Sequence, residues 1–212
     1  MGIQVSESLI LRTYPLKESD LIVSFLTRDQ GKMRGVANRA RRLKSGFGAG
    51  LERLLHVTLS YYQKENRDLV RIDGSELIRA HFSSKTYDQT VALDFIAEVS
   101  ELLLPAMEVN EKFFRLLLAV IADIDASTPE TMWKALTYFT LWAVRLQGFL
   151  PYIHVSEQSR ELGLQMVATP VGQMPSEGWT KATASDLRRS LIGLIEEHTE
   201  RRLITSQYLE AL

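Results

Sequence analysis

The residues with the clearest chemical potential are six cations between Gly31 and Leu51, a stretch that contains no acidic residue. Cations held this close repel one another, so a folded protein keeps them together where an anion relieves the repulsion. The end of the stretch is glycine-rich and carries one aromatic ring, Phe47. Positive charge for phosphates and a flat ring for a base are what a single-stranded nucleic-acid surface needs. The pattern therefore predicts phosphate contacts from Lys32, Arg34, Arg39, Arg41, Arg42 and Lys44.

Two interpretations of Phe47 follow from the residues alone. Its ring either stacks on a base or forms a small hydrophobic plug that pins the glycine-rich loop. Tyr62 is a weaker stacking candidate. The alternative for the whole stretch is a basic loop that is solvated and binds no ligand.

The sequence offers little for catalysis. The four histidines are scattered without metal-ligand spacing, and there is no phosphate-binding loop motif and no nucleophile motif. The carboxylates of Asp94, Glu98 and Glu101 share one face of an expected helix, which we interpret as its solvated face. We therefore expect a protein that is not an enzyme.

Charge divides the chain into unequal halves. Residues 1–80 hold 14 Lys and Arg against 9 Asp and Glu, a net +5, and residues 81–212 hold 11 against 17, a net −6. The first half is therefore the one expected to prefer a polyanion. No cysteine is present, which excludes disulfides and thiolate metal sites. No apolar run is long enough for a membrane span and no signal peptide is visible, so we expect a cytoplasmic protein.

The first 80 residues predict a domain of five short strands. Leu55, Val57, Leu59 and Tyr61 alternate with more polar residues, and Lys32 and Arg34 share one strand face. The longest connection, residues 38–53, falls between the third and fourth strands. This arrangement favours a five-stranded OB-type Greek-key barrel, with a different five-stranded barrel as the alternative.

Residues 81–212 predict an α-helical domain, which makes the whole chain an α+β protein. After residue 84 the apolar residues recur with a period of 3.6, which is typical of α-helices. The second helix, near residues 111–124, is apolar nearly all round and is expected at the centre of the bundle. A third helix is expected to start at Pro129, residues 149–182 to form an irregular insert, and a final helical region to follow from about Ser185.

Several motifs resemble the RecO family of bacterial DNA repair proteins, and the resemblance covers nearly the whole chain. They are E-S-D-L-I-V at 18–23, L-T-R-D-Q-G-K-M-R-G-V-A-N-R-A-R-R at 26–42, L-S-Y-Y at 59–62, R-L-Q-G-F-L-P at 145–151 and L-I-T-S-Q-Y-L at 203–209. The resemblance implies an OB fold joined to a helical domain that often bears a zinc module. It also implies a recombination mediator associated with the nucleoid, which binds single- and double-stranded DNA and anneals complementary strands. With RecR, such a mediator helps to load RecA onto DNA coated by SSB, whose acidic tail is an expected ligand.

The chain departs from that family pattern where many relatives have C-x-x-C. Here the residues are Ser156, Glu157, Gln158 and Ser159. A serine hydroxyl stays protonated near neutral pH and cannot replace a zinc thiolate. We therefore expect a cysteine-free remnant of the zinc module and no cofactor. The sequence leaves open what orders residues 149–182.

Two other functions fit the basic stretch. An RNA-binding OB protein would need the same charge and aromatic character. An adaptor whose basic loop docks an acidic protein tail would need only the charge, and binding to naked DNA separates it from a DNA-binding protein.

Overall fold

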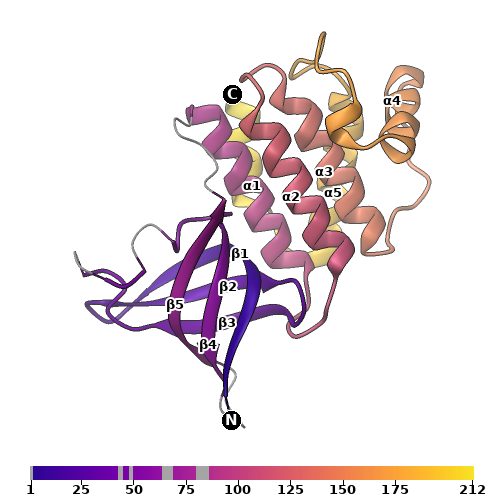
Figure 1. Cartoon of the computed structure of the whole chain (residues 1–212). Coiled ribbons are helices and arrows are strands. Elements are labelled where there is room, and N and C mark those ends of the chain that lie inside the picture. The colour runs from indigo at the N-terminus through magenta and orange to yellow at the C-terminus, as the bar shows by residue number, and fades with distance from the viewer. Residues whose placement is uncertain (1, 43–44, 48–49, 64–68, 80–85) are drawn as a thin grey trace. The chain divides into compact units, whose positions relative to one another are not determined.

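The computed structural model describes residues 2–42, 45–47, 50–63, 69–79 and 86–212. The described chain forms two compact units (Figure 1). The barrel unit comprises Met1–His81 and Leu104–Phe114, and the helical unit comprises Phe82–Leu103 and Arg115–Leu212.

Five strands close the barrel in the order β1-β2-β3-β5-β4, with β3 and β5 parallel and the other pairs antiparallel. The strands are β1 Ile3–Leu16, β2 Asp20–Thr27, β3 Gly31–Ala37, β4 His56–Tyr62 and β5 Leu69–Arg79. The expected OB-type barrel is therefore confirmed. Its core follows the period-2 pattern, since Val57, Leu59 and Tyr61 of β4 are fully buried among side chains from the other strands.

Residues 104–114 belong to the barrel unit, an assignment that the sequence did not suggest. The Met107 N–H donates to the Lys32 carbonyl at 2.9 Å. Gly31 has a φ of +79°, and a Cβ added there would lie 2.2 Å from the Glu108 carbonyl oxygen. Only glycine fits this position, because both the backbone conformation and the neighbouring chain exclude a side chain.

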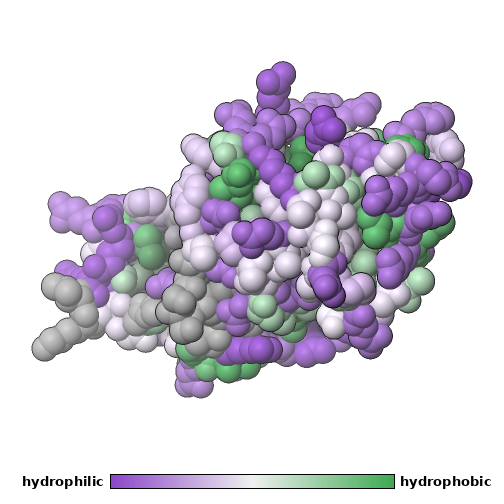
Figure 2. Space-filling view, turned by 90° about the horizontal axis from the view of Figure 1, so that it is seen from above, coloured by the Kyte–Doolittle hydropathy of each residue, from purple (hydrophilic) through white to green (hydrophobic). Residues whose placement is uncertain are grey.

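The helical unit contains most of α1 to α6 and a short 3₁₀ helix, η1. Their bounds are α1 Tyr87–Leu103, α2 Glu111–Asp125, α3 Met132–Leu146, α4 Glu157–Ala168, η1 Val171–Gln173, α5 Ser185–Thr199 and α6 Ile204–Ala211. Among the described residues, no helix is both long and apolar enough to cross a membrane. The visible face in Figure 2 carries hydrophilic side chains interspersed with small separate apolar patches.

Three details of the helical prediction are wrong. The central helix is α3, which packs against α1, α4, α5 and η1 and buries most of its residues, whereas α2 keeps an exposed face with Glu111, Lys112 and Arg115. Residues 149–182 are not irregular throughout, because they contain α4 and η1. Finally, α3 begins at Met132 rather than at Pro129, which lies in the preceding turn.

Candidate nucleic-acid interface

Strand β3 presents two of the predicted cations on its outer face. Met33, Gly35 and Ala37 point into the barrel and are buried, whereas Lys32 is half-buried and Arg34 is exposed on the opposite face. The strand register places Arg34 beside Ser24 of β2, which in turn pairs with Arg12 of β1. Arg12 is therefore a further cation of this face, and the sequence analysis missed it because its strand position depends on a bulge between Ile10 and Arg12.

The loop after β3 holds three exposed arginines at a fixed place. The Arg39 N–H donates to the Asp20 carboxylate at 2.8 Å, and the Arg41 N–H donates to the Ser19 carbonyl at 3.0 Å. These bonds attach the loop to the turn between β1 and β2. The Arg39, Arg41 and Arg42 side chains are exposed beside that turn. Lys44 lies outside the described residues.

The described cations of β3 and of the loop that follows it form a basic surface. They are Lys32, Arg34, Arg39, Arg41 and Arg42. In OB folds, the face of strands 2 and 3 and the loop between strands 1 and 2 are the usual oligonucleotide-binding surface. The basic surface occupies the equivalent place in this barrel.

Phe47 is not positioned to stack on a base. Its side chain is only 8% exposed and belongs to the barrel core, together with Leu51 and Leu55. The Gly50 N–H donates to the Phe47 carbonyl at 2.8 Å, and the Ser75 hydroxyl of β5 donates to the Gly50 carbonyl at 2.8 Å. Phe47 is thus a plug that anchors the loop, which was the second of the two interpretations.

Arg28 is a cation of the barrel unit with a structural role. It donates to Glu7 at 2.9 Å and to Glu111 at 3.2 Å, and Glu7 also contacts the buried His56 ring at 2.8 Å. Although partial burial opposes the shift, the hydrogen bonds from Arg28 and His56 lower the pKa of Glu7 below its usual value. This network joins β1, β4 and the start of α2 within the barrel unit.

The carboxylates of α1 do not form a solvated face, so that interpretation was wrong. Glu98 accepts hydrogen bonds from the Ile204 and Thr205 N–H groups at 2.9 Å each and thereby caps α6. Glu101 is 8% exposed, and Asp94 is half-buried. Their period-3.6 spacing could not reveal a partner more than 100 residues away.

The residues at the expected remnant of the zinc module do not fit a zinc ion. The Ser156 hydroxyl accepts the Ser159 N–H at the start of α4, and the Ser159 hydroxyl donates to Asp186 of α5. Neither hydroxyl is a thiolate, and the chain contains no cysteine. Among the described residues, no group of three or more His, Asp or Glu is placed to hold a metal.

Asp186 connects the start of α4 to α5 in place of a metal. Its two carboxylate oxygens accept the Ser159 hydroxyl and the Ser156 N–H, the latter at 2.7 Å, and the Leu187 N–H adds a third bond at 2.9 Å. Although burial opposes the shift, these hydrogen bonds lower the pKa of Asp186 far below its usual value.

Lys134 orders the segment that follows α4. Its ammonium group donates to the Val171 and Met174 carbonyls at 3.1 and 3.2 Å, to the Ser176 hydroxyl at 2.9 Å, and to the Asp123 carboxylate at 2.8 Å. The residue is only 2% exposed. One buried cation on α3 therefore fixes residues 171–176 against the helices.

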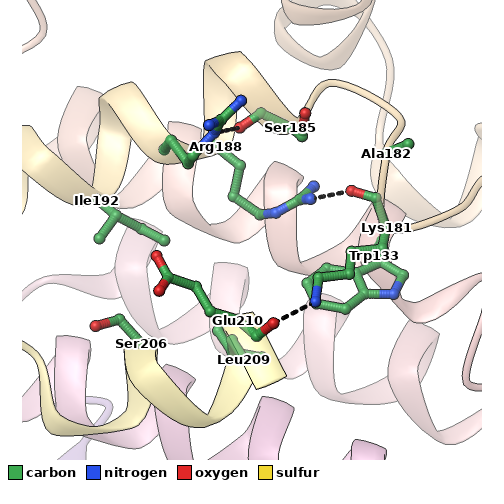
Figure 3. A pocket seen from close by; sticks show the side chains of 10 residues that line it. Trp133, Lys181, Ala182, Ser185, Arg188, Ile192, Ser206, Leu209 and Glu210 are labelled. Atoms are coloured by element: carbon green, nitrogen blue, oxygen red, sulfur yellow. Dashed lines mark hydrogen bonds between the residues drawn. The ribbon is translucent and has the colours of Figure 1, made fainter. Parts of the chain in front are cut away.

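A cavity of about 490 Å³ opens in the helical unit between α3, α5 and α6 (Figure 3). Trp133, Ile192 and Leu209 supply apolar walls. The Arg188 guanidinium lies 4.6 Å from the Trp133 ring centroid and donates to the Thr137 hydroxyl and to the Thr183 and Lys181 carbonyls. Burial lowers the pKa of Arg188 to about 10, with the neighbouring Arg189 cation adding to the effect, so it remains protonated at neutral pH.

Comparisons with known proteins agree with this architecture. The family model described as "Recombination protein O N terminal" matches residues 1–81. The DNA repair protein RecO of Koribacter versatilis is 34% identical over 242 aligned positions, which cover 98% of this chain and 98% of that protein. The DNA repair protein RecO of Bifidobacterium animalis subsp. lactis is 36% identical over 152 positions, covering 70% of this chain and 62% of that protein. A barrel with this strand order, a helical unit after it and similarity over nearly the full length together show that the chain belongs to the RecO family of DNA repair proteins.

Proposed function

We propose that this protein is a recombination mediator that binds single- and double-stranded DNA through its barrel unit. Family membership supports a role in DNA repair and recombination. The observation that carries the DNA-binding part is the basic surface, where exposed arginines are fixed by backbone hydrogen bonds to the β1–β2 turn. Phosphate contacts of this kind carry no base information, so binding is expected to be largely independent of sequence.

Strand annealing follows from the same chemistry. Two complementary strands repel one another through their phosphates, and cations that neutralise both strands lower that repulsion. Because this binding does not depend on the bases, the two strands can slide along each other until their bases pair. Within this proposal the protein works by binding rather than by catalysis, and together with RecR it helps to load RecA onto SSB-coated DNA in the cytoplasm.

The experiment that tests the proposal is a titration of the full chain against naked single-stranded DNA at several salt concentrations. Each phosphate contact releases counterions, so the logarithm of affinity should fall linearly with the logarithm of salt concentration. A chain that binds naked DNA weakly, with no salt dependence, would contradict the proposal and favour the adaptor alternative.

A docking site for an acidic protein tail outside the basic loop is the second candidate, and the cavity of the helical unit supports it. Trp133, Ile192 and Leu209 form its apolar walls, and the exposed cations Lys181 and Arg189 line it together with one carboxylate, that of Glu210. An acidic protein tail such as that of SSB is complementary to such a site in charge. Peptide titrations with wild type and Arg189→Glu would test this, because charge reversal should weaken binding of an acidic peptide while leaving DNA binding unchanged.

A further inference from the structure

We propose that the barrel carries a second part of the DNA site, a row of outward-facing residues that contacts the bases of single-stranded DNA. This inference rests on the proposed DNA-binding function. The outer row consists of one residue from each strand, in spatial order Tyr14, Ile22, Val36, Arg71 and Tyr62.

The strand register defines the outer row. Tyr14 pairs with Ile22, Ile22 with Val36, Val36 with Arg71, and Arg71 with Tyr62. Directly paired residues point to the same face of a sheet. Core residues flank the row on the other four strands, namely Val23 on β2, Ala37 on β3, Tyr61 on β4, and Val70 and Ile72 on β5, so the row faces outward, and pairing with Ile22 places Tyr14 on the same face. It spans four strand spacings, about 19 Å at roughly 4.8 Å per spacing. A nucleic-acid strand laid across the β-strands would meet these residues in turn.

Arg71 and Tyr62 form a flat, prearranged pair at one end of the row. The Arg71 guanidinium lies 5.6 Å from the Tyr62 ring centroid. Two hydrogen bonds to Asp73, at 2.8 and 3.1 Å, fix its plane. They also occupy donors of the guanidinium, so Arg71 is a poorer phosphate anchor than the loop arginines. What it offers is a planar surface, and unstacked bases stack on guanidinium planes as well as on aromatic rings.

Tyr14 and Arg12 form a second cation–aromatic pair at the other end. The Arg12 guanidinium lies 5.1 Å from the Tyr14 ring centroid. Between the two pairs, Ile22 and Val36 are half-buried and give the middle of the row an apolar floor. The next row along the strands contains Arg12 and Arg34 with Ser24 between them, so cations lie directly beside the apolar and aromatic residues.

The two parts of the site contact different parts of the DNA, the phosphates and the bases. The basic surface contacts phosphates, which single and double strands both display. The outer row contacts base faces, which a duplex hides inside its own stack. The outer row therefore adds affinity for single strands alone and distinguishes the two DNA forms.

The test uses the full chain, a single-stranded oligonucleotide containing 2-aminopurine, and the matching duplex. Tyr62→Leu removes the ring and Tyr62→Phe keeps it, while Arg71→Lys keeps the charge but loses the plane. We expect Tyr62→Leu and Arg71→Lys to weaken single-strand binding, by roughly fivefold or more for loss of one stacked base. Both should reduce the quenching of 2-aminopurine fluorescence, and Tyr62→Phe should behave like wild type. Duplex affinity and the salt slope should not change, because no charge is removed.

Several results would overturn the inference. One is unchanged single-strand affinity in both Tyr62→Leu and Arg71→Lys, and another is an equal loss for single strands and duplex. If Tyr62→Leu lowers the melting temperature, its loss of binding could reflect unfolding, and the inference is then judged on Arg71→Lys, because Arg71 is exposed. The proposed function fails separately, if the wild-type protein shows no salt-dependent binding to naked DNA. If the wild-type affinity falls with salt as expected and the variants bind like wild type, only the proposal of the outer row is rejected.

Discussion

The two units use their cations in different ways. In the barrel unit, Arg39, Arg41 and Arg42 have exposed side chains, and the backbone of their loop is fixed to the β1–β2 turn, to which Arg41 adds one long side-chain hydrogen bond, 3.4 Å to the Glu18 carbonyl. In the helical unit, Lys134 and Arg188 are 2% and 6% exposed, and their donors are engaged by carbonyls, hydroxyls and a carboxylate. Exposed cations of the first kind are available to an external polyanion. Buried cations of the second kind hold the chain together, so removing them should cost stability rather than DNA affinity.

The largest expected effect on stability comes from Lys134→Met. The substitution leaves the Asp123 carboxylate and two carbonyls without their donor, and breaking a buried ion pair costs about 3–5 kcal/mol. Denaturant unfolding should show this loss in the free energy of unfolding. The exposed Lys112→Met is the matched control and should change it by less than about 0.5 kcal/mol. A Lys134 variant as stable as the control would remove the distinction between the two kinds of cation.

Asp186→Asn should have the next largest effect, because the carboxylate accepts bonds from both Ser156 and Ser159. We expect a loss of about 1–3 kcal/mol at neutral pH. The pKa of Asp186 is lowered in the folded state, so its contribution is fully present above the unfolded pKa of about 3.9 and disappears as pH falls further.

Unfolding measured between neutral and acidic pH should therefore show the difference between wild type and Asp186→Asn narrowing as the pH falls below about 4. Ser159→Ala serves as a second variant, since it removes one of the bonds to the carboxylate. A difference that is constant with pH would show that the Asp186 charge does not stabilise the junction between α4 and α5.

A strong chelator should have no effect on stability. Asp186 and Lys134 order the region where a zinc module is expected in the family, and the residues there do not fit zinc. The melting temperature should be the same with and without chelator, and elemental analysis should find no stoichiometric zinc. One zinc per chain, or a lower melting temperature with chelator, would show that a metal contributes to this region.

The sequence predicted those features whose signal is local. The alternation of apolar and polar residues in β4 predicted which of its residues are buried in the barrel, and the spacing of Lys32 and Arg34 predicted that they share one face of β3. Phe47 was ambiguous because its glycine-rich surroundings do not indicate whether the ring packs inward. The outer row depends on strand register and on a bulge in β1, which no single segment encodes.

Features that depend on distant partners could not be predicted. Lys134 looks like an ordinary helix residue, and two of its acceptors are backbone carbonyls near residue 171, which have no sequence signature. Glu98 caps a helix more than 100 residues away. The assignment of residues 104–114 to the barrel unit depends on backbone contacts with Gly31 and Lys32 that only the folded chain reveals.

The most direct test of the central claim replaces Arg39, Arg41 and Arg42 together by Ala and measures single-stranded DNA affinity against salt concentration. Each lost phosphate contact reduces the slope by roughly 0.7, so the triple variant should flatten it by about two units. A control triple variant of the exposed Arg115, Arg201 and Arg202 in the helical unit removes the same charge from elsewhere. We expect the loop variant to lose affinity for any DNA sequence and to anneal strands poorly, with an unchanged melting temperature. A slope equal to that of wild type, or one flattened to the same extent by the control, would contradict the assignment of the basic surface as the DNA site.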